Sequence, residues 1–138
     1  MNRDQKKLGN KGFSLVELIV VIAIMAVLIG VLAPTLIKNI EKSRVSTDTQ
    51  NIDTVRQAIV YTIAEDEFHE AFLDNEIYLD GATGVLTTKN GAQDTAALNE
   101  VLNQIGKSTC PLKSKEYKDK KITFSVSNSA VVNMSVSS

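Results

Sequence analysis

Residues 12–37 read GFSLVELIVVIAIMAVLIGVLAPTLI, and this stretch decides the fold class of the 138-residue chain. No residue between Leu18 and Ile37 carries a charge. A helix rises about 1.5 Å per residue, so this segment matches the roughly 30 Å hydrocarbon core of a bilayer. Residues 13–37 are therefore predicted to form a membrane helix that holds a single carboxylate, Glu17, near its start.

The residues before this helix form a short basic leader. Residues 1–12 hold four basic side chains and one acid and have no apolar stretch of their own, so they represent only the charged part of a targeting signal. Basic residues on this side favour a cytoplasmic N-terminus with the remainder of the chain outside. Cleavage after the apolar core is disfavoured, because the nearest small-x-small triplet ends at Ala33 and Pro34 follows it.

Glu17 needs a partner, because a charged side chain in hydrocarbon costs about 2.5–3.5 kcal/mol on insertion scales. Cleavage after Gly12 would free the α-amino group of Phe13, one helical turn from Glu17 of the same chain and open to Glu17 of a neighbouring chain. We therefore predict that cleavage supplies the counter-charge. The alternative is that Glu17 lies near the interface and reaches water.

The leader, Gly12, the segment FSLVE at residues 13–17 and the apolar run containing Pro34 closely resemble the class III signal of type IV pilins and pseudopilins. The resemblance covers residues 6–44. It implies that a prepilin peptidase cuts between Gly12 and Phe13 and methylates the new amine of Phe13. It also implies that Glu17 meets the N-terminus of an incoming subunit during assembly.

The later part of the apolar run contains the weakest helical segment. In a helix interior, glycine costs about 1 kcal/mol and proline about 3 kcal/mol relative to alanine. The resemblance implies that this segment loses helicity within a filament; the alternative is a kinked but continuous helix. Many family members have a second glycine earlier in the span, where this chain has alanines. The predicted melting segment consists of Gly30, Val31, Leu32, Ala33 and Pro34.

Three segments are expected: a cleaved leader at residues 1–12, a membrane and assembly helix at residues 13–37, and a soluble part at residues 38–138. Apolar residues at helical spacing extend the helix to about Glu67, with one face packed on a small domain. These residues are Ile40, Ile52, Val55, Ile59 and Ile63.

The small domain is predicted to contain a sheet and one short helix. Strands are expected at residues 77–79 and 85–88, and an antiparallel pair at residues 122–126 and 132–136 with the turn at 127–129. Both strands of that pair are expected to place apolar faces under the long helix. The short helix has Asp94 as its predicted N-cap, carries Leu98, Val101, Leu102 and Ile105 on one face, and ends at Gly106. The fold class is α+β, a long N-terminal helix packed on a small antiparallel sheet, which is pilin-like.

Charge and cysteine content restrict the partners. Without the leader, 11 basic and 15 acidic side chains remain, a net charge of −4 that provides no strong field for polyanions. A basic run at residues 113–121 is interpreted as a solvated loop. The alternatives are that its lysines contact DNA or that they contact the acidic residues 65–70 of a neighbouring copy. Cys110 is the only cysteine, so no intrachain disulfide can form, and we predict a small buried apolar residue.

Catalysis is not expected, because the sequence contains no nucleophile–base pair, phosphate-binding loop or dinucleotide fingerprint. No cofactor and no metal are predicted. The alternatives are a metal held by His69 with Glu65 or Asp66, and calcium held by Asp74, Glu76 and Asp80. The acidic stretch around His69 is interpreted instead as a hydrated helix end.

The predicted function is a structural subunit of a type IV pilus, a homo-oligomeric helical filament for adhesion, twitching motility or DNA uptake. The chain would lie in the cell membrane before assembly and on the cell surface afterwards, with prepilin peptidase, an assembly platform and an ATPase as partners and no nucleic acid. Two alternatives remain: a pseudopilin of a type II secretion or competence machine, and a membrane-anchored binding domain that never polymerises and keeps its leader.

Overall fold

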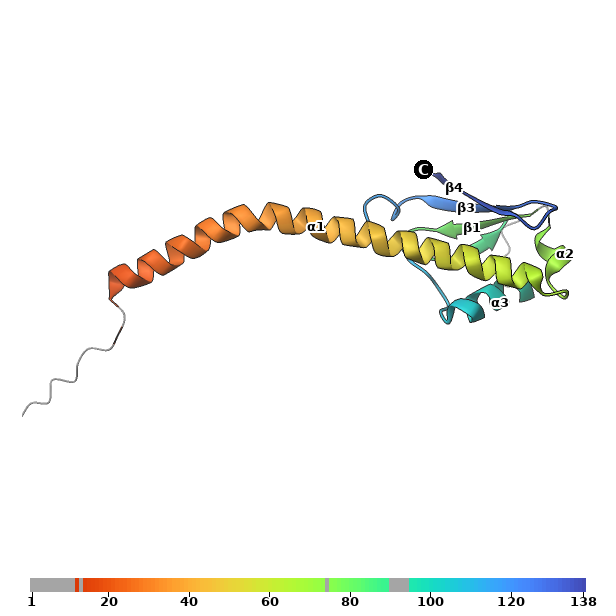
Figure 1. Cartoon of the computed structure of the whole chain (residues 1–138), viewed down its shortest axis with the longest axis horizontal. Coiled ribbons are helices and arrows are strands. Elements are labelled where there is room, and N and C mark those ends of the chain that lie inside the picture. The colour runs from red at the N-terminus through yellow and green to blue at the C-terminus, as the bar shows by residue number, and fades with distance from the viewer. Residues whose placement is uncertain (1–11, 13, 74, 90–94) are drawn as a thin grey trace, which may run out of the picture. The chain divides into compact units, whose positions relative to one another are not determined.

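The computed structural model describes residues 12, 14–73, 75–89 and 95–138. The chain divides into two compact units, Met1–Asn39 and Ile40–Ser138. The long helix and the small sheet confirm the predicted α+β class (Figure 1). In chain order the elements are α1 (Leu15–Ala64), α2 (His69–Phe72), β1 (Glu76–Asp80), β2 (Leu86–Thr88), α3 (Ala96–Ile105), β3 (Lys121–Val126) and β4 (Val132–Ser137).

Helix α1 is 50 residues long and contains Pro34 without a break in the assigned helix. It ends at Ala64, slightly before the predicted end near Glu67. Its last turn contains no basic residue, and acids follow directly. The negative end of the helix dipole disfavours acids in a final turn, so the early end is expected on electrostatic grounds.

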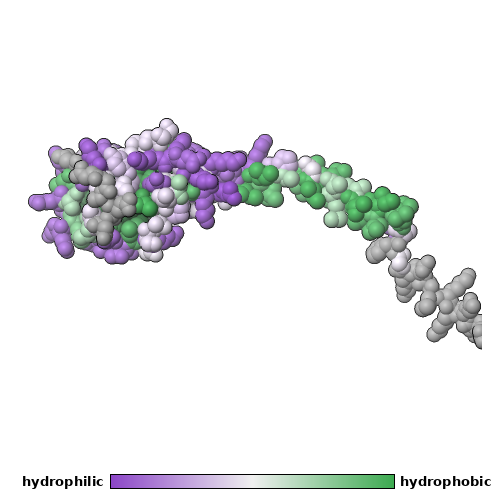
Figure 2. Space-filling view, turned by 180° about the vertical axis from the view of Figure 1, so that it is seen from behind, coloured by the Kyte–Doolittle hydropathy of each residue, from purple (hydrophilic) through white to green (hydrophobic). Residues whose placement is uncertain are grey.

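In the first unit, the apolar side chains of α1 are exposed on every side. Sixteen large apolar residues between Leu15 and Ile37 have exposed fractions from 49% at Val20 to 74% at Leu15. Figure 2 shows this segment as a hydrophobic surface. Among the described residues, α1 is the one helix long and apolar enough to cross a membrane. A helix that is apolar all round requires an apolar environment, either lipid or other protein.

In the second unit, four antiparallel strands form one sheet in the order β2-β1-β3-β4. All four predicted strands are confirmed. Side chains alternate across β1 and β3, so that Ile77, Leu79, Ile122 and Phe124 are fully buried. They form one core with Ile52, Val55, Ile59 and Ile63 of α1. Ile40, which was predicted to lie on the same face, is 44% exposed, so that part of the prediction is wrong.

Strand β4 departs from the prediction. Only Val132 is buried, whereas Met134 is 48% and Val136 39% exposed. Both side chains lie opposite buried residues of β3, Phe124 and Ile122, in the register of the pair. β4 is an edge strand, and the core includes residues of α1, β1, β2 and β3 but only Val132 from β4. The expected apolar face therefore exists, but most of it is uncovered.

Helix α3 begins and ends by capping. Thr95 is the N-cap, and its side-chain oxygen accepts a hydrogen bond from the N–H of Leu98 at 3.2 Å. The predicted N-cap, Asp94, lies outside the described residues, as does Asp74, one of the residues considered for calcium. Gly106 ends the helix with φ 73°, the left-handed conformation that glycine adopts without a steric penalty. The predicted apolar face and end of this helix are confirmed.

Candidate functional site

The start of α1 is held by a reciprocal pair of hydrogen bonds between Ser14 and Glu17. The N–H of Glu17 donates to Oγ of Ser14 at 3.3 Å, and the N–H of Ser14 donates to Oε2 of Glu17 at 3.2 Å. This arrangement is a capping box, which satisfies two backbone donors that the first helical turn leaves unpaired. The Ser-x-x-Glu spacing is visible in the sequence, but our sequence reasoning did not use it.

The capping box brings the carboxylate of Glu17 close to the predicted cleavage point. The N–H that it accepts belongs to the peptide bond between residues 13 and 14, and Phe13 itself lies outside the described residues. A free amine at residue 13 would be a cation at the positive end of the helix dipole, which is unfavourable without a nearby anion. The role of Glu17 as that anion stays a prediction.

Gly12 has no structural requirement for glycine among the described residues. A Cβ at this position would have nothing within 4 Å, and its φ lies outside the left-handed region. If glycine is needed here, the reason therefore lies in a molecule that recognises the chain.

Gly30 and Pro34 combine to weaken the same turn of α1. Proline has no N–H, so the hydrogen bond that residue 34 would donate to the carbonyl of residue 30 is missing. The carbonyl left without this donor belongs to Gly30, which has the lower helix propensity. The segment is helical in the single chain. The predicted loss of helicity concerns a filament and stays a prediction.

The residues considered for metal binding have local structural roles. Nδ1 of His69 lies 3.0 Å from the carbonyl oxygen of Ile63 near the end of α1. Asp80 accepts hydrogen bonds from the N–H groups of Ala82 and Thr83, and the bond from Thr83 is the main cause of its lowered pKa. The described residues contain no group of three or more His, Cys, Asp or Glu side chains placed to hold a metal.

Two carboxylates on α1 bind the loop after Cys110, an arrangement that our sequence reasoning missed. Asp48 is only 1% exposed and accepts hydrogen bonds from the N–H of Lys113 at 3.0 Å and of Ser114 at 2.7 Å. Seven residues earlier, Oε1 of Glu41 accepts from the N–H of Lys115 at 2.6 Å. The sequence does contain one indication of this role: Asp48 is a charged residue on the apolar face of α1, four residues before Ile52.

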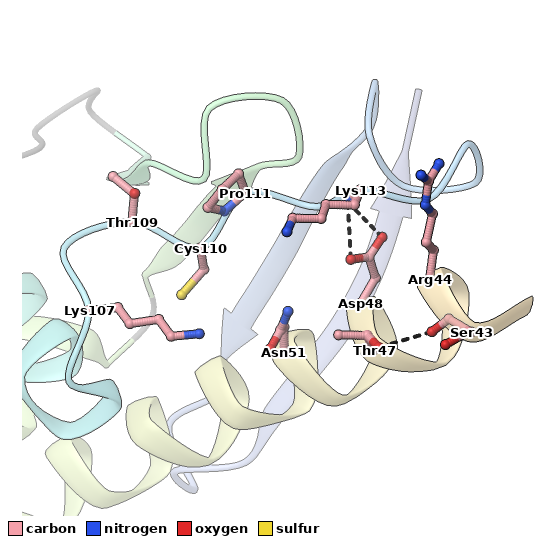
Figure 3. Close-up of a pocket in the computed structure, with 10 residues that line it drawn as sticks. All are labelled: Ser43, Arg44, Thr47, Asp48, Asn51, Lys107, Thr109, Cys110, Pro111 and Lys113. Atoms are coloured by element: carbon pink, nitrogen blue, oxygen red, sulfur yellow. Dashed lines mark hydrogen bonds between the residues drawn. The ribbon is translucent and has the colours of Figure 1, made fainter. Parts of the chain in front are cut away.

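Beside this loop lies a pocket of about 450 Å³, lined by α1 and residues 107–113 (Figure 3). Its lining includes three cations and one acid, Arg44, Lys107, Lys113 and Asp48. Cys110 forms part of the wall and belongs to the buried core, as predicted. Burial raises the pKa of the Cys110 thiol, and nearby Lys107 partly opposes this shift.

Two lysines of the basic run at residues 113–121 have different surroundings. Lys113 lines the pocket, while the ammonium of Lys121 lies 5.0 Å from the centre of the Tyr78 ring. The ammonium groups of this run therefore have different surroundings.

Residues 7–33 match the family model described as the prokaryotic N-terminal methylation motif. The match includes Gly12, Ser14 and Glu17 and ends just before Pro34. No curated protein and no solved structure matches the chain.

Proposed function

We propose that this chain, which carries the class III signal of type IV pilins and pseudopilins, is a structural subunit of a type IV pilus filament. The motif implies processing by a prepilin peptidase and a role in pilin-type assembly. The finer proposal is that mature copies polymerise through α1 into a helical filament on the cell surface.

The observation that carries the proposal is the exposure of α1 between Leu15 and Ile37. Burying one large aliphatic side chain is worth about 1.5–3 kcal/mol. Sixteen such side chains are exposed, so an apolar environment is favoured by tens of kcal/mol on this scale. Lipid provides that environment before assembly, and the same helices of other copies provide it inside a filament.

Cleavage after Gly12 then prepares each copy for assembly. The new amine of Phe13, methylated but still cationic, can pair with Glu17 of a neighbouring copy and so set the axial position of each incoming subunit. A head-to-tail contact closes into a ring only if the rotation from one subunit to the next adds up to a full turn without a rise along the axis. Otherwise it extends into an open helical filament, as we propose here. An assembly platform and an ATPase would supply the work, and the chain itself would need neither enzymatic activity nor a cofactor.

Electron microscopy of sheared surface material, with intact-mass analysis of the same material, tests the proposal. We expect filaments whose subunit begins at Phe13 and carries one added methyl group. Assembled material whose subunit begins at Met1 would contradict the proposal. A cleaved chain that is required for protein export or transformation but forms no long fibres would assign it to a pseudopilin system instead.

A further inference from the structure

The second unit carries two surfaces of opposite charge. The first is the basic pocket, defined by Arg44, Lys107 and Lys113 beside α1. Figure 3 shows the amino ends of Lys107 and Lys113 and the side-chain amide of Asn51 directed toward one space, with Arg44 directed away from it at the outside. The one acid of the lining, Asp48, already accepts backbone hydrogen bonds from the adjoining loop. The pocket therefore presents more positive than negative side chains, three cations against one acid.

The second surface is the acidic turn, defined by Glu65, Asp66, Glu67 and Glu70 after the end of α1. All four side chains are exposed. The one ion pair between described residues, that of Arg56 with Asp53, involves neither surface. His69, within the acidic turn, directs Nδ1 at a backbone carbonyl. Within the described part of the chain, therefore, no ion pair neutralises the charges of the acidic turn or of the basic pocket.

The two surfaces lie at opposite ends of the same stretch of helix. Thr47 lines the basic pocket, and Ala64 directly precedes the acidic turn. A helical rise of about 1.5 Å per residue separates these residues by about 26 Å along α1. A copy displaced along this axis can therefore place its acidic turn at the basic pocket of the next copy. An interface between two different patches is heterologous, and heterologous contacts produce open filaments or rings and not closed two-fold dimers.

We propose that the basic pocket receives the acidic turn of a second copy of this chain. The inference rests on the proposed function, because it requires copies arranged head to tail. The pocket selects the neighbour's carboxylates by charge and by the convergent donors of Lys107, Lys113 and Asn51. Because these groups are partly solvated, the contact chiefly determines register and partner choice.

Charge reversal in the full-length chain, expressed with its assembly system, tests this interface. The double variant Lys107→Glu with Lys113→Glu is expected to lower the yield of sheared filaments at least tenfold, and so is Asp66→Lys with Glu67→Lys. Combining all four changes should restore the yield to within about threefold of wild type. The matched control, Lys89→Glu with Glu116→Lys, reverses exposed charges outside both surfaces and should assemble normally.

A cross-link provides the direct readout. In a chain with Cys110→Ala, the changes Thr109→Cys and Asp66→Cys are expected to produce a ladder of disulfide-linked copies in filaments, and either change alone should produce none. Normal filaments from the reversed variants, no rescue by the combined variant, or absence of the ladder would each overturn the interface. Mass analysis of the membrane-bound chain separates the two proposals, since a wild-type chain that keeps its leader and never assembles would refute the proposed function itself.

Discussion

The carboxylate of Glu17 has a partner in its own chain, the N–H of Ser14, before a second copy is present. This bond explains how the residue can enter a membrane without a counter-ion, because hydrogen bonding lowers the cost of burying a charge. It also separates two roles for the same side chain. The capping role needs an acceptor, whereas pairing with an amine needs a negative charge.

The variant Glu17→Gln distinguishes these roles. Glutamine can occupy the same position of a capping box, so the helix start should be preserved while the charge is lost. We expect normal membrane insertion and a strongly reduced filament yield, measured by immunoblotting of membrane and sheared fractions. Ser14→Ala is the control, because it removes a cap worth about 1 kcal/mol and keeps the charge. Wild-type filament yield from Glu17→Gln would refute the pairing role.

Asp48 determines how the loop after Cys110 is held. Asp48→Ala would leave two backbone N–H groups, those of Lys113 and Ser114, without this acceptor, at about 1–3 kcal/mol each, so we expect the free energy of unfolding to fall by about 2–6 kcal/mol. Denaturant titration measures the change. Asp48→Asn keeps an acceptor and should lose less.

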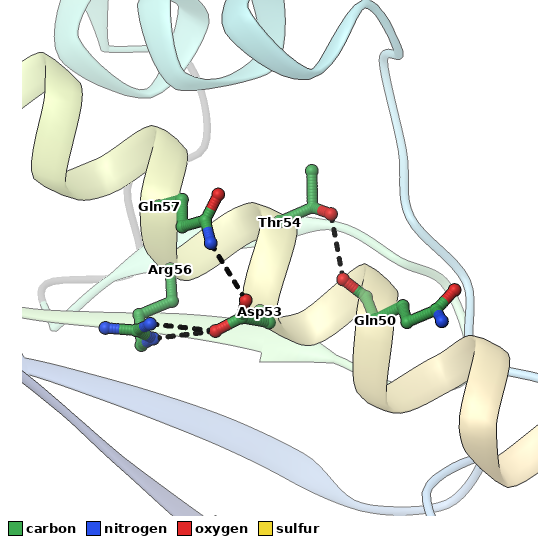
Figure 4. A network of polar contacts seen from close by, with 5 residues as sticks. All are labelled: Gln50, Asp53, Thr54, Arg56 and Gln57. Carbon is green, nitrogen blue, oxygen red and sulfur yellow. Dashed lines mark hydrogen bonds and ion pairs between the residues drawn. The ribbon is translucent and has the colours of Figure 1, made fainter.

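The control for Asp48 is another aspartate on the same helix. Asp53 pairs with Arg56 at 2.9 Å and also accepts a hydrogen bond from Gln57 (Figure 4). The Asp53 and Arg56 side chains are 48% and 38% exposed, and such pairs contribute about 0–1 kcal/mol. Asp53→Ala should therefore change stability by less than about 1 kcal/mol. Equal losses from Asp48→Ala and Asp53→Ala would contradict the structural role of Asp48.

Sequence reasoning could select Gly12, Phe13 and Glu17 as processing and assembly residues because the chemistry of that segment is local, and these roles stay predictions. It did not identify Asp48, whose nearest partner in the chain is 65 residues away. A charged residue on an apolar helix face signals that some partner exists. Which backbone groups provide it depends on how the loop folds back, and no local pattern contains that information.

At the scale of elements, periodicity predicted the second half of α1, α3 and all four strands, because apolar residues recur on one face of each. The four-residue helix α2 was not predicted, since so short a segment has no periodicity to detect. The exposure of β4 was also missed. Alternation shows which side chains share a face, but it does not show how many strands a single helix can cover.

Helix α1 yields a prediction about its own weak point. Pro34→Ala restores a backbone donor opposite the carbonyl of Gly30 and removes a penalty of about 3 kcal/mol. In detergent-solubilised chain, amide hydrogen exchange near Gly30 should slow by up to about a hundredfold, the factor that corresponds to this free energy. Leu28→Ala leaves the backbone bonds unchanged and is the control. Unchanged exchange in Pro34→Ala would show that this segment is not the weak point of the helix.

The same variant, Pro34→Ala, also tests the prediction that residues 30–34 lose helicity in the filament. If the segment at residues 30–34 must lose helicity during assembly, a stronger helix there opposes it. We therefore expect Pro34→Ala to be processed normally but to yield fewer filaments than wild type. Full assembly of this variant would favour a continuous helix in the filament.

At the scale of the whole molecule, the buried core that the described residues form lies in the second unit. The buried apolar residues all lie between Ile52 and Val132. We therefore expect a chain of residues 40–138 to remain folded without the first unit, with a cooperative thermal transition observed by circular dichroism. A gradual transition without a plateau would show that the core depends on residues before Ile40.

The pairing of β1 with β3 affects when this core can form. Glu76 pairs with Ser125, and between these strands the chain forms β2 and α3. During synthesis α1 is complete long before β3 emerges, and contacts between distant residues form slowly. The sheet therefore cannot close until Ser125 has been synthesised, long after the apolar first part of α1 is complete.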